Sequence, residues 1–352
     1  MRDEMRPLYA MEKAYDELKP LYEFNLNHPG EFEGWKSGFR TKLIELLGGF
    51  PEKVDLNPEV VEKVHFNGYT REKVLYHTAP YVMASAYVLI PDGIEDRVPA
   101  VLALCGHGYG NKDIVGINED GTDRDMPRPL PAGYHKDFAL ELVRRGMVVI
   151  APEPMGFGER REEEDIAKGP HATSCRKASF YAMMMGKTLI GMRVWDTIRA
   201  LDYLQERPEV DPYRIGCMGI SGGGMMALFT TAVEDRIKAV VVSGYLCTFK
   251  DSVMSIYHCE DNYIPGILKY GEMYDIACLV APRPMLIESG TDDPIFPIKA
   301  VDYAYERVKK AYELLGVPQN LARDRFEGEH QISGRISYDW LFNELHQVTH
   351  EK

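Results

Sequence analysis

The amino-acid sequence predicts an α/β fold with a doubly wound, mostly parallel β-sheet, preceded by a helical segment. Continuous apolar runs such as PAVLALCG (99–106) and MVVIAPEP (147–154) are typical of parallel strands that are buried on both faces. Helical patterns alternate with these runs along the chain, which implies right-handed crossovers between parallel strands. Strand-like runs between residues 60 and 91 are separated by turn-like residues and indicate an antiparallel meander before the parallel part.

The first 50 residues have a helical pattern. The stretch EFEGWKSGFRTKLIELLGGFPEK carries Phe39, Leu43 and Leu46 at helical spacing and stops at the glycine pair 48–49. We therefore expect residues 1–50 to form a helical segment that packs on the core. Residues 51–352 are then expected to form a single α/β domain.

The elements of this domain follow from the order of its apolar runs. The patterns predict helices over residues 135–146 and 186–208, and strands over residues 99–106, 147–154, 213–221, 237–245, 283–290 and 322–328. Three segments fit neither pattern, at residues 109–133, 155–182 and 248–280, and each follows the C-terminal end of a predicted strand. Because ligands bind at these strand ends in open α/β sheets, we expect the three segments to surround a site as lid-like loops.

Composition and charge exclude several classes of function. The chain has a formal net charge of −13 and no basic block that could neutralise phosphates, which argues against a nucleic-acid partner. No run approaches the roughly 18 apolar residues of a membrane-spanning helix, and the N-terminus lacks the apolar stretch of a secretory signal. The six cysteines are scattered without a CxxC pair, which favours reduced thiols and a cytoplasmic location. The sequence leaves a homo-oligomer open.

A serine among glycines occupies the junction between a predicted strand and a predicted helix. The stretch GISGG (219–223) matches G-x-S-x-G, and residues 225–232 after it are rich in helix formers. A nucleophilic serine on such a sharp turn needs small neighbours, because side chains two positions away would collide. The N–H groups of the following helix would point toward the serine oxygen. We therefore predict that Ser221 is a nucleophile.

A nucleophilic serine needs a base and an acid that orients the base, and this motif places the acid and then the histidine later in the chain. His330 follows the last predicted strand in the glycine-flanked stretch FEGEHQISG, which makes it the predicted base. Two aspartates end the strand-like stretch IESGTDDPIFP. Asp293 is the preferred acid because Pro294 fixes the loop after it; Asp292 is the alternative and Asp251 a more distant one.

An oxyanion hole needs a second N–H group besides that of Gly222, and the loop after the strand over residues 99–106 is expected to supply it. Tyr109 in the stretch LALCGHGYG is the preferred donor, with Gly108 as the alternative. The stretch HCEDNY (258–263) gathers residue types that bind metals, but neighbours in sequence seldom converge on one ion. We therefore expect no metal and no cofactor.

These motifs together resemble the α/β-hydrolase superfamily over roughly residues 60–350. The stretches HGYG, GISGG, GTDDPIFP and GEH are similar to those of bacterial dienelactone-hydrolase-like and acetyl xylan esterase-like carboxylesterases. The resemblance implies the α/β-hydrolase fold, hydrolase chemistry, and the G-x-x-D-x-x-x-P pattern that places the acid at Asp293. It implies no particular substrate, because the loops of this superfamily vary freely. The segment after HGYG departs from the family in being long and charged.

The sequence therefore predicts a serine carboxylesterase that hydrolyses short-chain acyl esters of small molecules through an acyl-enzyme, with acetylated sugars as candidate substrates. The three segments are rich in Asp, Glu, Arg and Tyr, which suit hydroxyl-bearing leaving groups, and Tyr109 is expected to help close the acyl side. The alternatives are a lactone hydrolase, a peptidase of the prolyl oligopeptidase type, and an inactive hydrolase-fold binding module. Only about 100 residues precede HGYG, which is too short for the propeller of such peptidases.

Overall fold

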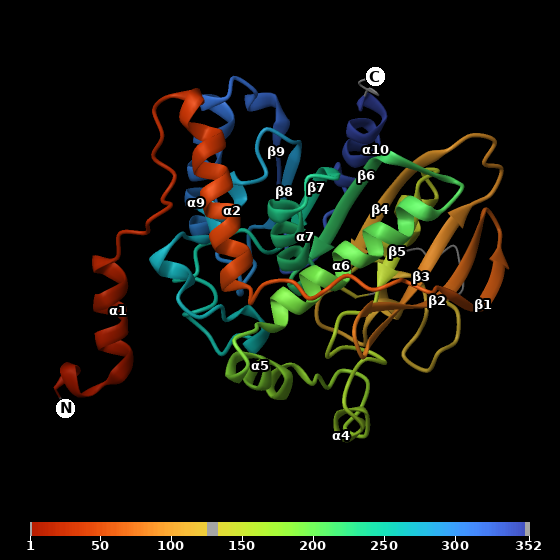
Figure 1. The fold of residues 1–352 in the computed structure, drawn as a ribbon, viewed down its shortest axis with the longest axis horizontal. Helices are drawn as coiled ribbons and strands as arrows, with labels where there is room; N and C mark the ends of the chain where they lie inside the picture. Colours follow the sequence, from red (N-terminus) through yellow and green to blue (C-terminus); the bar gives the residue numbers. More distant parts are fainter. Residues whose placement is uncertain (1, 125–132, 349–352) are drawn as a thin grey trace.

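The computed structural model describes residues 2–124 and 133–348, and in this part of the chain a nine-stranded β-sheet carries helices on both faces (Figure 1). The strands are β1 (Glu59–Phe66), β2 (Tyr69–Ala79), β3 (Val82–Pro91), β4 (Val98–Leu104), β5 (Val148–Pro152), β6 (Val210–Ile220), β7 (Ile237–Ser243), β8 (Met285–Gly290) and β9 (Leu321–Phe326). Their order in the sheet is β1-β2-β3-β5-β4-β6-β7-β8-β9.

The sheet has an antiparallel part and a parallel part. β1, β2 and β3 pair antiparallel, and β3 joins the rest through an antiparallel pairing with β5. All pairings from β5 through β4 and β6 to β9 are parallel. The predicted fold class, a doubly wound and mostly parallel sheet, is confirmed, and so is the antiparallel meander.

Two hydrophobic cores lie on the two faces of the sheet. In β4 the side chains of Leu102 and Leu104 belong to one core and those of Val101 and Ala103 to the other, as the two-residue period of a strand requires. α2 (Phe32–Leu46), α6 (Leu189–Glu206), α7 (Gly222–Val233), α8 (Met273–Cys278) and α9 (Ile298–Leu314) contribute to the first core. α3 (Phe138–Val143) and α10 (Ser337–Gln347) contribute to the second. Burial on both faces explains why these strands read as continuous apolar runs.

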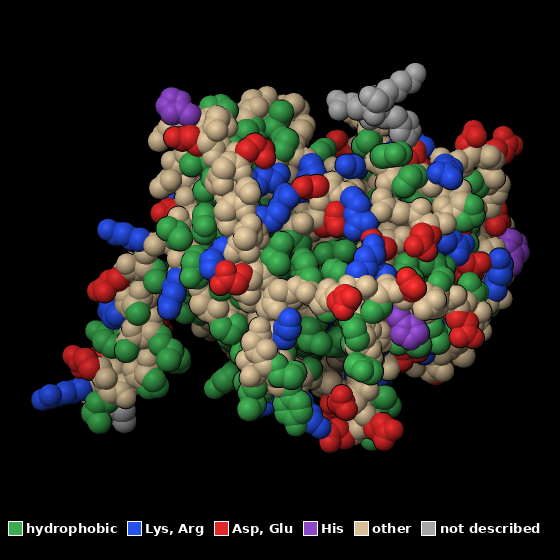
Figure 2. All heavy atoms as spheres, viewed as in Figure 1, with side chains coloured by type: hydrophobic (Ala, Val, Ile, Leu, Met, Phe, Trp, Pro, Cys, Tyr) green, Lys and Arg blue, Asp and Glu red, His purple; other side chains and the backbone are tan. Residues whose placement is uncertain are grey.

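The N-terminal segment contains two helices with different surroundings. α2 buries Phe32, Phe39 and Leu43 against the first core, and the Lys36 ammonium donates to the carbonyl of Ala281 at 2.7 Å. α1 (Pro7–Glu17) buries none of its side chains and stands away from the body of the molecule (Figures 1 and 2). The segment of residues 1–50 therefore contains two helices: α2 packs on the first core, and α1 is exposed.

The structure also differs from the sequence prediction in its connecting segments. The helix predicted from residue 135 begins at Phe138, because Lys136 and Asp137 have φ values of 51° and 49°. Residues 155–182 contain α4 (Glu163–Ile166) and most of α5 (Cys175–Met184), and residues 248–280 contain α8. Of the segment 109–133, residues 125–132 lie outside the described residues. Among the described helices, none combines the length and apolar character that crossing a membrane requires.

Candidate active site

Ser221 lies at the sharp turn between β6 and α7, in a backbone conformation that few side chains adopt. Its φ is 57° and its ψ is −123°. A Cβ atom on Gly219 would lie 2.2 Å from the carbonyl oxygen of Gly223, and one on Gly223 would lie 1.9 Å from that of Leu104. The two outer glycines of the motif are therefore required by contact with the neighbouring backbone. Such a strained serine turn has the geometry of the nucleophile elbow expected of G-x-S-x-G.

His330 and Asp293 form a pair beside this turn. The Nδ1 atom of His330 lies 2.7 Å from Oδ2 of Asp293, and both side chains are largely buried. The loop after β8 supplies Asp293 and the loop after β9 supplies His330, so parallel strands bring both to one edge of the sheet. Of the two aspartates weighed from the sequence, the structure places Asp293 on the imidazole and leaves Asp292 exposed.

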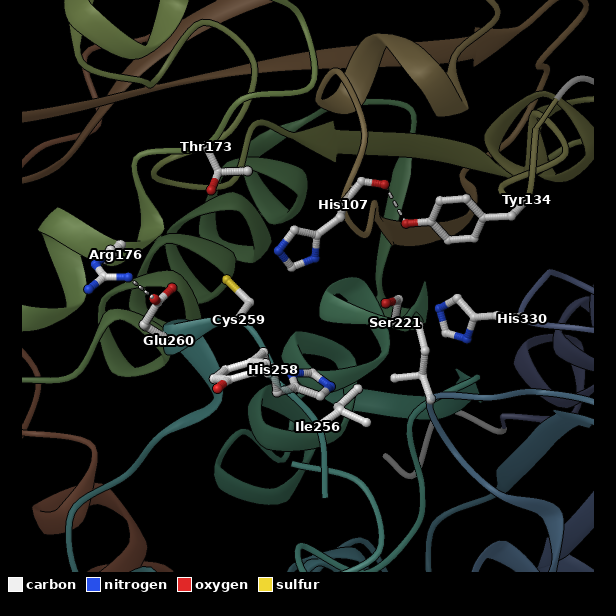
Figure 3. A pocket seen from close by; sticks show the side chains of 12 residues that line it. His107, Tyr134, Thr173, Arg176, Ser221, Ile256, His258, Cys259, Glu260 and His330 are labelled. Carbon is white, nitrogen blue, oxygen red and sulfur yellow. Dashed lines mark hydrogen bonds and ion pairs between the residues drawn. The ribbon is translucent and has the colours of Figure 1, made fainter. Parts of the chain in front are cut away.

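Ser221 and His330 line one cavity of about 630 Å³ (Figure 3). The His330 ring lies next to Ser221, and its buried Nε2 has no hydrogen-bond partner within the described residues. With Nδ1 facing Asp293, the Nε2 atom is the one left to exchange a proton with a group in the cavity. A serine, an imidazole with a free nitrogen and a buried carboxylate make up the set of groups that acyl transfer uses.

The two predicted N–H donors have different positions. Gly222 is the first residue of α7, a 12-residue helix whose N-terminal N–H groups favour negative charge. The Tyr109 side chain turns toward the following loop, where its hydroxyl donates to the carbonyl of Ile117 at 3.0 Å and contacts Arg124. His107, rather than Tyr109, lines the cavity with Ser221. The expectation that the Tyr109 side chain closes the acyl side is therefore wrong, because the hydrogen bonds of its hydroxyl hold it elsewhere.

A buried histidine braces the loop that carries His107. The Nε2 atom of His135 accepts a hydrogen bond from the Gly106 N–H at 2.9 Å, and its Nδ1 lies 2.7 Å from Asp113. These partners define the neutral tautomer with the proton on Nδ1. Burial lowers the pKa of His135, which favours the neutral ring. The hydrogen bond from the Gly106 N–H to His135 therefore fixes the backbone of the loop after β4.

Tyr134 is a member of the site that motif analysis of the sequence missed. Its hydroxyl donates to the carbonyl of His107 at 2.5 Å, and its ring stacks on His330 with centroids 5.4 Å apart. Burial raises the pKa of Tyr134, while a hydrogen bond with the Ser221 hydroxyl acts in the opposite direction. No local pattern marks this tyrosine, since only the fold brings it to the serine.

The remaining walls of the cavity divide by polarity. Ile256 and Ile295 contribute aliphatic side chains to the lining. Arg176 and Glu260, which approach each other to 3.8 Å, line the part of the cavity away from Ser221 (Figure 3). Residues from two of the three segments that the sequence left without helix or strand contribute to these walls: Thr173, Arg176, Ile256, Tyr257, His258, Cys259 and Glu260.

The serine turn at the carboxyl edge of a mostly parallel sheet, with an aspartate and a histidine from the next loops, defines the class of this protein as an α/β hydrolase. Residues 8–343 match the model of the abhydrolase family. The chain belongs to this family.

Known proteins support the same assignment. The chain is 31% identical over 285 residues to the "Putative hydrolase YtaP" of Bacillus subtilis (strain 168), covering 78% of this chain and 86% of that protein. A "putative acetyl xylan esterase" from Bacteroides fragilis NCTC 9343 has a similar structure, with a TM-score of 0.77, 22% identity, and coverage of 92% of this chain and 82% of that one. The glucuronoyl esterase from Solibacter usitatus gives a TM-score of 0.64 at 14% identity, covering 94% of this chain and 99% of that one. At these low identities, the structural similarities show a shared fold.

Proposed function

We propose that this protein is a serine carboxylesterase that hydrolyses short-chain acyl esters through an acyl-enzyme intermediate. The observation that carries the proposal is the strained turn of Ser221 beside the His330–Asp293 pair in one cavity. The relative named as a hydrolase and the fold shared with proteins named as acetyl xylan and glucuronoyl esterases support the same reaction class.

In the proposed reaction, the Ser221 hydroxyl attacks the ester carbonyl while Nε2 of His330 takes the hydroxyl proton. Asp293 accepts the Nδ1–H of the resulting imidazolium and stabilises its charge. The N–H of Gly222 and an N–H from the loop of residues 106–109 stabilise the oxyanion, with Tyr109 the donor predicted from the sequence. His330 then donates its proton to the leaving alcohol, and water releases the acid by the same steps in reverse. These steps need no cofactor.

We propose acetyl to about butyryl groups on a hydroxyl-rich alcohol, such as a sugar, as substrates. Support comes from the cavity, because Ile256 and Ile295 are the only aliphatic side chains in its lining among the described residues, and charged and hydroxyl-bearing side chains line it as well. Polar side chains that can hydrogen-bond to sugar hydroxyls are Thr173, Arg176, Tyr257 and Glu260.

The test is kcat/KM across p-nitrophenyl esters from acetate to decanoate, together with acetate release from acetylated sugars. We expect the highest value between acetate and butyrate, and no hydrolysis above background by Ser221→Ala. A maximum at octanoate or longer would contradict the short acyl pocket. A preference for acetate without activity on acetylated sugars would retain the acyl assignment and reject the sugar.

A further inference from the structure

A second group of reactive side chains lies beside the serine site. His107, Cys175, Cys259 and Asp261 each offer one ligand atom, and all four atoms lie within 4.8 Å of one another. Separate segments provide them: the loop after β4, the first residue of α5, and the loop between β7 and α8. From the sequence we expect no metal here, because residues 258–263 are neighbours along the chain. The fold adds a histidine and a cysteine from distant positions to two of those neighbours.

We propose that these four side chains bind one zinc-type divalent cation in a tetrahedral site with a structural role. Two thiolates, an imidazole and a carboxylate are the ligand types that Zn²⁺ takes, usually four at a time in structural sites. Tetrahedral bonds of about 2.0–2.3 Å place ligand atoms roughly 3.3–3.8 Å apart, so the observed spacing needs only small side-chain movements to close on an ion.

A buried arginine balances the charge of this site. Arg193 is fully buried, and its guanidinium lies 2.5 Å from Asp261 and 3.1 Å from the sulfur of Cys175. When Zn²⁺ binds, the two thiols give up their protons, so a double positive charge replaces two protons and the net charge of the buried group is unchanged. The arginine N–H groups then hydrogen-bond to two of the ligands from outside, as supporting residues of metal sites do.

The cation has a route of entry and a connection to the serine. Cys175 and Asp261 are buried, whereas His107 and Cys259 line the cavity that contains Ser221 (Figure 3). The Nδ1 atom of His107 lies 3.7 Å from where a Cβ atom on Gly222 would be. A cation on the His107 ring would therefore fix the loop that faces the start of α7. With four protein ligands, it would have no open position for substrate, and the ester reaction would not pass through it.

The test measures metal rather than activity. Full-length protein purified without added chelator is analysed for metal content, and the chelator-treated, reduced protein is titrated with Co²⁺. We expect about one zinc per chain, and one equivalent of Co²⁺ giving thiolate charge-transfer bands and the strong visible bands of a tetrahedral site. Cys259→Ser, at a partly exposed position, should weaken Co²⁺ binding by at least about tenfold, and Cys175→Ser should do the same.

Cys278→Ala is the matched control, because Cys278 is a buried thiol on α8 outside the four-residue cluster. It should bind the metal like the wild type, and circular dichroism of all variants verifies that they are folded. Wild-type protein without a thiolate–cobalt band would overturn the proposal. So would unchanged Co²⁺ binding in the two serine variants, or a Cys175–Cys259 disulfide in metal-free protein as purified. Since esterase activity is measured separately, each of these results leaves the serine mechanism standing.

Discussion

At the residue scale, Asp293 is fixed through both of its oxygens. Oδ1 accepts hydrogen bonds from the N–H groups of Ile295 and Phe296 at 2.8 and 3.1 Å, which directs Oδ2 at His330. Asp292 lacks this arrangement: it is exposed, and its side chain contacts only the hydroxyl of Thr291 at 3.3 Å among the hydrogen bonds of the described residues. The two adjacent carboxylates therefore differ in their contacts although they are identical in chemistry.

This difference predicts unequal effects of two matched substitutions. Asp293→Asn should lower kcat by about three to four orders of magnitude, because an amide cannot stabilise the imidazolium and favours the wrong tautomer of His330. Asp292→Asn should change kcat less than about threefold, as expected of an exposed side chain away from the reaction. Steady-state hydrolysis of p-nitrophenyl acetate measures both. A larger loss in Asp292→Asn than in Asp293→Asn would reverse the assignment of the acid.

A buried carboxyl next to β5 predicts a pH-dependent stability. Glu153 follows β5 directly, its Oε1 accepts the N–H of Asn111 at 3.0 Å, and burial raises its pKa from 4.5 to about 7. Between these two values the folded protein binds more protons than the unfolded chain, so this group lowers the free energy of unfolding as pH rises from about 4.5 to 7. The full loss is about 3 kcal/mol above pH 7.

Glu153→Gln removes this titration while retaining an oxygen that can accept the Asn111 N–H. Its stability relative to the wild type should increase as pH rises from 5 to 8, by up to about 3 kcal/mol. Urea unfolding at several pH values measures the difference. A stability difference that stays constant over this range would show that Glu153 does not titrate there.

At the scale of elements, the turn between β6 and α7 depends on glycine for steric reasons that differ from position to position. A Cβ atom on Gly223 would overlap the carbonyl oxygen of Leu104 in β4, whereas the nearest atom to a Cβ on Gly222 is 3.7 Å away. Gly223→Ala should therefore lower the free energy of unfolding by about 3 kcal/mol or more. Gly222→Ala should change the free energy of unfolding by at most about 1 kcal/mol, since the added methyl group has room and alanine favours a helix. Equal stabilities by chemical denaturation would contradict this account of the motif.

The elements that can be predicted best from the sequence are those that a pattern of neighbouring residues determines. The serine turn could be found because glycines and flanking apolar runs mark it, and Asp293 and His330 because they directly follow predicted strands. α5 was missed because it presents Phe180, Tyr181 and Met184 to solvent, so its apolar residues do not follow the helical pattern of a buried face. Tyr134 and the cluster around Cys175 were missed because residues distant in sequence define them, and no spacing rule connects such positions.

At the scale of the whole molecule, the N-terminal segment contributes unequally to stability. Phe39 on α2 is fully buried, and its ring lies 2.4 Å from where a Cβ atom on Gly271 would be. α1 is tied to the body by a hydrogen bond from Tyr15 to Glu272 and an exposed ion pair between Asp16 and Lys250. The apolar side chains of Leu8 and Met11 on α1 remain exposed.

Phe39→Ala should therefore lower the free energy of unfolding by about 3–5 kcal/mol, as the removal of a large core side chain does. Deletion of residues 1–17 should lower the free energy of unfolding by less than about 2 kcal/mol, because it removes a hydrogen bond and an exposed ion pair but no core side chain. Thermal and urea unfolding of the two proteins measure the contrast. A truncated protein as unstable as Phe39→Ala would show that α1 belongs to the core.

Covalent labelling tests whether Ser221 forms the proposed acyl-enzyme. The protein is treated with a fluorophosphonate, which traps activated serines, and the modified peptide is identified by mass spectrometry. We predict a single adduct on Ser221, with labelling abolished in Ser221→Ala and strongly slowed in His330→Ala because the base is missing. Ester hydrolysis that persists without any adduct, or an adduct on another residue, would show that Ser221 is not the nucleophile.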